Sequence, residues 1–182
     1  MSAGVGLCLL AGAIVLGSTR TGGDPIVSAI SRQINPGGSS AADGVIDEPA
    51  DVDDTRLPAL ANLDPALLAA VRRAAHAAAA HGITVRVTSG WRSRQYQQRL
   101  LDQAIRKYGS DHEARRWVRT PNDSQHVVGA AIDIGPTDAA DWFSRHGSDY
   151  GLCQVYANEM WHYELLTTPH GECPALRPDN AS

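Results

Sequence analysis

Ser124-Gln-His-Val-Val-Gly-Ala-Ala-Ile-Asp133 is the stretch of sequence that most constrains the fold. It places a histidine and an aspartate on either side of a glycine and a short run of residues that favour a β-strand. Gly129 permits a tight or bulged entry into this strand. Because side chains alternate along a strand, Asp133 shares a face with Ala131, and Ile132 points the other way. Asp133 is therefore a carboxylate in an apolar strand, which is costly to bury unless it is paired or bound to a metal.

A second polar motif follows in Glu159-Met-Trp-His162. His162 completes a set of metal ligands with His126 and Asp133, and Glu159 adds a carboxylate beside them. Three protein ligands, an open position for water and a neighbouring base are the components of a catalytic zinc site. Each residue alone has an ordinary interpretation as a loop or strand side chain, so the prediction depends on their combination. A bend near Met160 is needed to aim Glu159 and His162 at one point.

Arg92 lies in Ser89-Gly90-Trp91-Arg92-Ser93, at the predicted junction between a strand and a helix. Junctions of this kind often carry functional residues. A cation near a helix N-terminus is mildly unfavourable, so we expect Arg92 to have a partner. Its rigid fork of donors suits a carboxylate or a developing oxyanion. The alternative is an arginine on the surface.

The bulk properties are those of one globular domain with additional segments. The chain has 182 residues, of which 43% are hydrophobic and 20% are charged. The net charge is -4 and the isoelectric point is about 5.9. Because no basic stripe is present, nucleic-acid binding has no support.

The N-terminal part of the sequence is expected to lie outside the folded domain. Residues 1–20 contain an apolar run and are interpreted as an export signal or membrane anchor. No basic residue precedes the run, and an apolar tail without a targeting role is the alternative. Residues 21–56 are rich in Gly, Ser, Pro, Ala and Asp and are expected to form a disordered linker. We therefore expect a domain over residues 57–175, a loose tail over 176–182, and a cell-envelope location, membrane-anchored or secreted.

The pattern of apolar residues predicts an α+β domain. Asp64 and Pro65 are suitable N-cap and first residues for a helix that ends near Gly82. Helical segments are also expected over residues 93–108, 113–118 and 138–146, and strands over 83–88, 130–134, 151–156 and 161–166. Because the last two strands are adjacent in sequence, we expect a small antiparallel sheet flanked by helices.

Cys153 and Cys173 are the cysteines of the expected domain. If the chain is exported, we expect a disulfide between them. It would close a loop of about 20 residues and stabilise the fold by roughly 3 kcal/mol. Two buried free thiols are the alternative.

In combination, these motifs resemble a known family. Ser-x-His-x-x-Gly-x-Ala-x-Asp, followed by Glu-x-x-His and preceded by Ser-Gly-Trp-Arg-Ser, is similar to the VanY-type D-alanyl-D-alanine carboxypeptidases, which are zinc peptidases. The resemblance extends from about Leu63 to Leu166 and implies a small α+β fold with an antiparallel sheet. One departure is Met160, which stands where many relatives have proline.

The resemblance also implies roles for individual residues. Zn2+ would be held by His126, Asp133 and His162. Glu159 would act first as general base and then as acid, and Arg92 would steady the oxyanion or the substrate. The substrate would contact Ser124, Gln125 and Trp161.

The implied reaction is removal of the terminal D-Ala from peptidoglycan stem peptides by a monomeric enzyme. A D,D-dipeptidase or a peptidoglycan endopeptidase would use the same chemistry. A non-catalytic zinc-binding module of the cell wall is the rival from another class. The presence of Glu159 and Arg92 argues against that module, because zinc binding alone requires neither residue.

Overall fold

The computed structural model describes residues 38–181. The expected export signal or anchor and the first part of the expected linker lie outside these residues. Within residues 38–181, no helix has both the length and the apolar character needed to cross a membrane.

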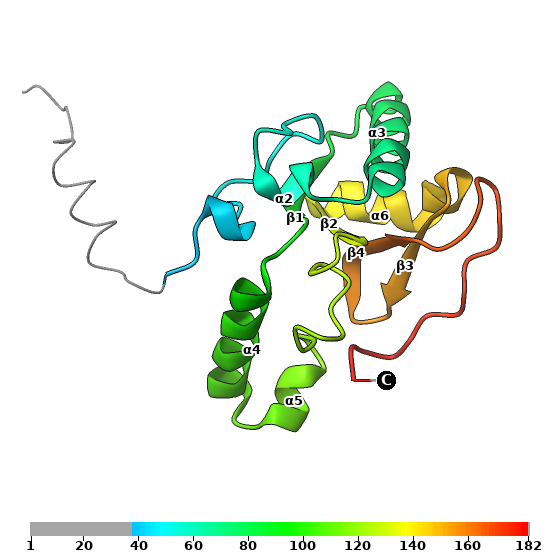
Figure 1. Cartoon of the computed structure of the whole chain (residues 1–182). Coiled ribbons are helices and arrows are strands. Elements are labelled where there is room, and N and C mark those ends of the chain that lie inside the picture. The colour runs from blue at the N-terminus through cyan, green and yellow to red at the C-terminus, as the bar shows by residue number, and fades with distance from the viewer. Residues whose placement is uncertain (1–37, 182) are drawn as a thin grey trace, which may run out of the picture. The chain divides into compact units, whose positions relative to one another are not determined.

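The centre of the domain is an antiparallel sheet of four strands in the order β1-β2-β4-β3 (Figure 1). The strands are β1 (Arg86–Ser89), β2 (Ala131–Gly135), β3 (Leu152–Tyr156) and β4 (Glu159–Leu165). Every residue of β2 is buried, which explains why its sequence is mostly apolar. The α+β class predicted from the sequence is confirmed.

Helices α3 (Pro65–Ala80) and α6 (Thr137–His146) pack against the sheet and form the main core with it (Figure 1). The Asp64 side chain accepts hydrogen bonds from the first turn of α3, as its predicted role as N-cap requires. Val71, Phe143 and Tyr163 are buried in this core. Burial of this apolar surface is the main force that holds the sheet in place.

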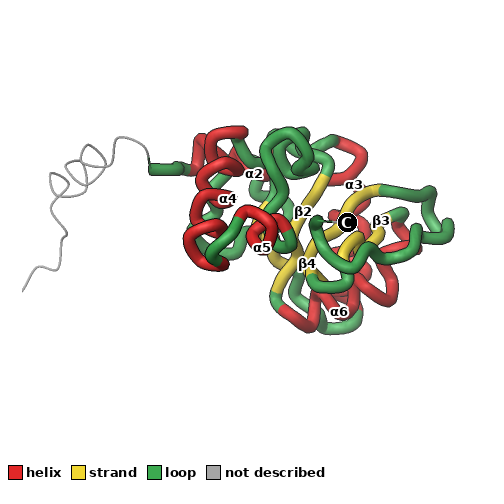
Figure 2. Tube along the Cα trace, turned by 90° about the horizontal axis from the view of Figure 1, so that it is seen from below, coloured by secondary structure: helices red, strands yellow, loops and turns green. Residues whose placement is uncertain are grey.

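A second group of helices stands apart from this core (Figures 1 and 2). Helix α4 (Arg94–Tyr108) is capped by Ser93 and turns at Gly109 towards the short helix α5 (Asp111–Arg115). The two helices bury a small apolar cluster of their own. They therefore supply a wall to the site that is separate from the sheet.

The described residues also contain three short helices, η1 (Ala41–Asp43), α2 (Pro58–Ala61) and η2 (Gly147–Tyr150). The expected linker extends too far, because η1 and the residues after it belong to the compact unit that begins at Ser39. Ala50 forms a β-bridge with Val87 and is buried. Several acidic side chains of this segment are paired, for example Asp51 with Arg86 at 2.8 Å. This segment is irregular and packs through isolated apolar residues. Its sequence therefore lacks the helix or strand periodicity from which an ordered structure could be predicted.

The prediction of a loose tail over residues 176–182 is also wrong. Residues 173–181, here called the C-terminal strap, dock beside β3, where Arg177 forms a parallel β-bridge with Tyr156. A disulfide joins Cys153 of β3 to Cys173, the pair of cysteines considered in the sequence analysis. Asn180 is buried near the end of the strap. The domain therefore continues past residue 175.

Candidate metal centre

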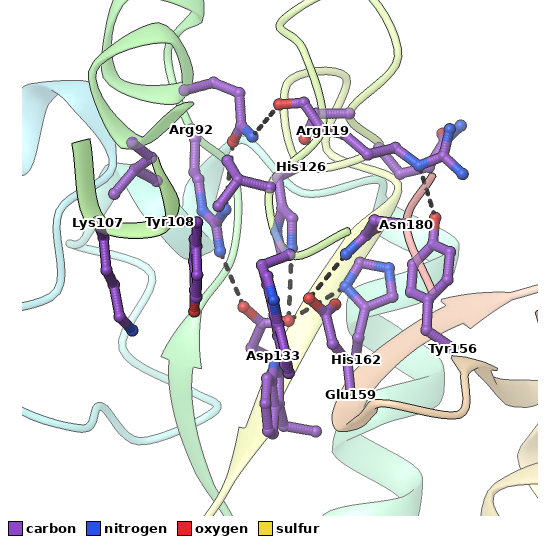
Figure 3. Close-up of a pocket in the computed structure, with 17 residues that line it drawn as sticks. Arg92, Lys107, Tyr108, Arg119, His126, Asp133, Tyr156, Glu159, His162 and Asn180 are labelled. Atoms are coloured by element: carbon purple, nitrogen blue, oxygen red, sulfur yellow. Dashed lines mark hydrogen bonds and ion pairs between the residues drawn. The ribbon is translucent and has the colours of Figure 1, made fainter. Parts of the chain in front are cut away.

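The three predicted metal ligands converge at one end of the sheet (Figure 3). Antiparallel pairing of β2 with β4 places Asp133 directly opposite His162. His126 precedes β2 in a turn closed by a hydrogen bond from Gly129 N–H to the His126 carbonyl. All three side chains are buried, and one ligand atom from each lies within 4.8 Å of the others.

The distances between these ligand atoms fit a tetrahedral zinc ion. Asp133 Oδ1 lies 3.2 Å from His162 Nδ1 and 3.4 Å from His126 Nε2. Ligands at about 2.0–2.1 Å from a tetrahedral ion are separated from one another by about 3.3 Å. Two imidazoles and a carboxylate are also donors that zinc prefers, and three protein ligands leave one position open.

His126 is oriented by the backbone of the segment before α4. Its Nδ1 donates to the Gly90 carbonyl at 2.8 Å, so the lone pair of Nε2 faces Asp133. Burial lowers the pKa of His126 to about 4, and the Arg92 charge acts in the same direction. Gly90 itself must be glycine, because a Cβ there would lie 2.3 Å from the Ala59 carbonyl oxygen. His126 is thus held neutral and ready to bind a cation.

His162 is held between two carboxylates. Its Nδ1 faces Asp133, and its Nε2 lies 3.1 Å from Glu164 Oε1. Burial alone would lower the pKa of His162, but the hydrogen bonds to Asp133 and Glu164 outweigh it and raise the pKa to about 9. Glu164 was not predicted from the sequence. Its position two residues after His162 was a usable signal, because residues two apart on a strand share a face.

The contact with Glu164 predicts an effect on zinc affinity. A carboxylate that accepts the outer N–H of a ligating histidine fixes the ring and raises its basicity. We expect Glu164→Ala to weaken zinc binding by about 10- to 100-fold, and Glu164→Gln, which keeps an acceptor, to weaken it less. Competition with a chromogenic chelator measures this. The exposed Glu172 supplies the control Glu172→Ala, and an unaltered zinc affinity in Glu164→Ala would contradict the assignment.

The raised pKa of His162 predicts that zinc binds more tightly as the pH rises. Below a pKa of about 9 the imidazole of His162 is protonated in the metal-free site, and zinc must displace this proton. The apparent affinity should therefore rise about tenfold per pH unit between about pH 6 and pH 8. Chelator competition at several pH values, corrected for the chelator's own protonation, tests this. A flat profile would show that His162 binds as a neutral ring without losing a proton.

Arg92 is fastened to the metal ligands more closely than the sequence suggested. Its Nη2 donates to Asp133 Oδ2 at 2.8 Å, its Nε to Ser89 Oγ at 2.8 Å and its Nη1 to Gln97 Oε1 at 3.2 Å. Burial alone would raise the pKa of Asp133, but His126, His162 and Arg92 together hold it well below its usual range. Arg92 thus keeps a ligand charged and oriented. A guanidinium has more donors than these three bonds use, and Arg92 also lines the cleft.

A bulge in β4 brings Glu159 to the same cleft as His162. Tyr156 pairs with Glu159 and Gln154 pairs with Tyr163, so two steps along β3 match four along β4. This irregularity replaces the bend that was expected near Met160. Glu159 is buried, and burial, reinforced by the Asp133 charge, raises its pKa to about 7. A carboxylate with this pKa can accept and return a proton near neutral pH.

The metal centre opens onto a cleft of about 480 Å³ (Figure 3). Ser124, Gln125 and Trp161 line it, as their predicted role in substrate binding requires. Further lining residues carry no motif and were not predicted: Gln97, Lys107, Tyr108, Trp117, Arg119, Tyr156 and Asn180. Most of them come from the α4–α5 side of the cleft, which is rich in cationic and aromatic side chains.

The fold and the site define a small α+β protein with a His–Asp–His centre and a buried glutamate beside it. The family model described as VanY, D-alanyl-D-alanine carboxypeptidase, matches residues 60–168. The chain belongs to this family. The match includes every predicted ligand together with Glu159 and Arg92.

Individual relatives match part of their own length. A D-alanyl-D-alanine carboxypeptidase from Enterococcus faecalis is 27% identical over 115 residues, which are 50% of this chain and 43% of that protein. A bifunctional D-Ala-D-Ala dipeptidase and D-Ala-D-Ala carboxypeptidase from Enterococcus gallinarum is 25% identical over 113 residues, 48% of this chain and 59% of that protein. The chain thus spans about half the length of these curated relatives.

A solved structure shares the fold. It is a mutant of the vancomycin resistance D,D-pentapeptidase VanY in complex with Zn(II). The sequence identity is 24% and the TM-score is 0.54, with 66% of this chain and 84% of that chain covered. The likeness supports the α+β class and the arrangement of the sheet.

Proposed function

We propose that the chain is a zinc-dependent D,D-carboxypeptidase that removes the terminal D-Ala from peptidoglycan stem peptides. The observation that carries this proposal is the placement of Glu159, a buried carboxylate with a pKa of about 7, in one cleft with His126, Asp133 and His162. Family membership supports the substrate class, because both curated relatives are named for D-Ala-D-Ala chemistry. Zinc is supported by the donor set and by the VanY complex with Zn(II).

Each residue of the centre has a part in peptide hydrolysis. A zinc ion held by His126, Asp133 and His162 would polarise the scissile carbonyl and make a water molecule in its open position more acidic. Glu159 accepts a proton from the attacking water as the new carbon–oxygen bond forms. As the carbon–nitrogen bond breaks, Glu159 returns this proton to the leaving amine of D-Ala.

Arg92 supports the reaction from the side of Asp133. Its ion pair keeps Asp133 charged, and its remaining donors stabilise the oxyanion that forms as water adds to the carbonyl. Ser124, Gln125 and Trp161 position the substrate in the cleft. The chain itself thus supplies a base, an anion-stabilising group and a binding surface.

Two alternatives keep the same fold. A D,D-dipeptidase is favoured by the bifunctional relative, and an endopeptidase would cut within the stem peptide by the same chemistry. A non-catalytic zinc-binding module is disfavoured, because burying Glu159 uncoordinated beside the ligands carries a cost that zinc binding alone does not require.

Product masses distinguish these functions. The zinc-loaded chain is incubated with a pentapeptide that ends in D-Ala-D-Ala, and the products are weighed by mass spectrometry. Loss of a single alanine supports the carboxypeptidase, and release of the dipeptide indicates a D,D-dipeptidase. An internal cut indicates an endopeptidase, and no cleavage supports the non-catalytic module.

We further propose that the chain works in the cell envelope, outside the cytoplasm. The disulfide between Cys153 and Cys173 suits an oxidising compartment, and peptidoglycan lies there. Labelling of intact cells with an impermeant reagent, compared with labelling after lysis, tests this location. A chain that is labelled only after lysis would contradict it.

A further inference from the structure

We propose that Asn180 is a positioning residue for Glu159 and that the C-terminal strap delivers it to the site. Asn180 Nδ2 donates to Glu159 Oε1 at 2.7 Å (Figure 3). The exposed fractions of Asn180 and Glu159 are only 8% and 6%. Asn180 lies beyond residues 60–168, which match the family model, so the family assignment does not cover it. The inference rests on the proposed role of Glu159 as the catalytic base.

The strap is held to β3 at two positions before it reaches Asn180. The disulfide ties Cys173 to Cys153 of β3. Farther along, Arg177 N–H donates to the Val155 carbonyl at 2.9 Å, and the Arg177 carbonyl accepts from Ala157 N–H at 2.8 Å. These bonds form an isolated parallel β-bridge beside β3. Asn180, near the end of the strap, lines the cleft. Figures 1 and 2 show the course of the strap.

The end of the strap is fixed to the segment that follows α5. Asp179 forms an ion pair with Arg116 at 2.8 Å, and Asn180 N–H donates to the Arg116 carbonyl at 3.3 Å. The backbone of Asn180 is thus tied down immediately next to the side chain that contacts Glu159. A strap that crosses from the sheet to the α4–α5 side in this way can place one side chain reproducibly.

The contact determines how the Glu159 carboxylate is presented. The terminal torsion of a glutamate side chain is broad, so a carboxylate without partners samples many orientations. The amide N–H of Asn180 occupies Oε1 and leaves the other oxygen for the attacking water. The same bond favours the charged form of Glu159 and opposes the effect of burial. Asn180 thus fixes the orientation of the Glu159 carboxylate and favours its charged form, which is the form that can accept a proton.

The test compares Asn180→Ala and Asn180→Asp with the wild-type chain in the zinc-loaded state. Steady-state release of D-Ala from the pentapeptide is measured for each. We expect kcat to fall by about 10- to 100-fold in Asn180→Ala, with KM and zinc affinity little changed, because only the base is misplaced. Aspartate has nearly the same size but lacks the N–H donor, so Asn180→Asp should lose at least as much. Leu176→Ala, an exposed site on the strap, is the matched control and should keep its rate.

A second measurement examines the contact without catalysis. In the 15N NMR spectrum of the metal-free chain, the side-chain amide of Asn180 is identified by its loss in Asn180→Ala. Its signals should move clearly in Glu159→Ala and remain in place in Glu172→Ala. This readout stands even if the pentapeptide is not cleaved, an outcome that would reject the proposed function alone.

Three kinetic results would overturn the inference. One is an unchanged kcat in both Asn180 variants, and another is near-wild-type activity in Asn180→Asp, which would reduce Asn180 to a packing role. The third is a higher rate in either variant, which would make the strap a cover that inhibits the base. If the wild-type chain does not cleave the pentapeptide, the NMR result decides alone. Asn180 amide signals that keep their wild-type positions in Glu159→Ala would then overturn the inference.

Discussion

Glu159→Gln is expected to lower kcat for D-Ala release by about 100- to 10,000-fold, the usual contribution of a general base. Glutamine matches the size of Glu159 but cannot accept the proton of the attacking water. Because Glu159 is separate from the His126, Asp133 and His162 ligand set, zinc should bind with little change. Steady-state kinetics on the pentapeptide, together with the zinc content of the same preparation, measures both effects.

Glu172→Gln provides the control for this substitution, because Glu172 is exposed and has no part in the proposed mechanism. It should retain the wild-type rate. A Glu159→Gln variant that holds zinc and still releases D-Ala at the wild-type rate would remove Glu159 from the mechanism. A variant that loses zinc would instead make Glu159 part of the metal centre.

Asp133→Ala is expected to abolish zinc binding and activity and to destabilise the metal-free fold by about 3–5 kcal/mol. Asp133 forms an ion pair with Arg92, and the exposed fractions of the two side chains are 9% and 14%. Removing the carboxylate leaves the partly buried guanidinium without its charged partner and leaves His162 without one of its two acceptors. Metal analysis and urea unfolding of the chelator-treated protein measure the two losses separately.

Two further variants separate the loss of the metal from the loss of the ion pair. Arg92→Met added to Asp133→Ala removes the unpaired charge, so part of the stability should return while zinc binding does not. Asp141→Ala breaks an exposed pair with Arg145 and should cost less than about 1 kcal/mol. A loss in Asp133→Ala no larger than in Asp141→Ala would show that the buried pair is not important for the fold.

The residues of the metal centre could be predicted because their side chains are suitable zinc ligands and the sequence pattern around them indicates a strand. His126 and Asp133 flank a short strand, and the strand pattern puts Asp133 on the face opposite Ile132, which packs in the core. His162 and Glu159 follow in a second motif. The bulge in β4 that brings Glu159 and His162 to one cleft could not be predicted, because a bulge depends on the pairing of two strands. Glu164 was missed although its spacing from His162 made it accessible to the same reasoning.

Other parts of the site carry no such signal. Asn180 comes from an irregular strap whose order depends on the disulfide, on Arg177 and on Asp179. None of these long-range contacts produces a helix or strand periodicity in the sequence. The same reason explains the misplaced domain boundary, since residues around Ala50 are ordered by long-range contacts such as the bridge of Ala50 to β1 and the ion pair of Asp51 with Arg86. Local patterns therefore predicted the strands and the ligands, whereas tertiary contacts determined the borders and the strap.

Metal-dependent release of D-Ala is the most direct test of the central claim that the His126, Asp133 and His162 centre is a catalytic zinc site. The chain is stripped with a chelator, dialysed, and titrated with zinc in the presence of a pentapeptide ending in D-Ala-D-Ala. We expect no release without metal and full release at one zinc per chain. Release that persists in the stripped chain, or that does not appear at any zinc concentration, would contradict the claim.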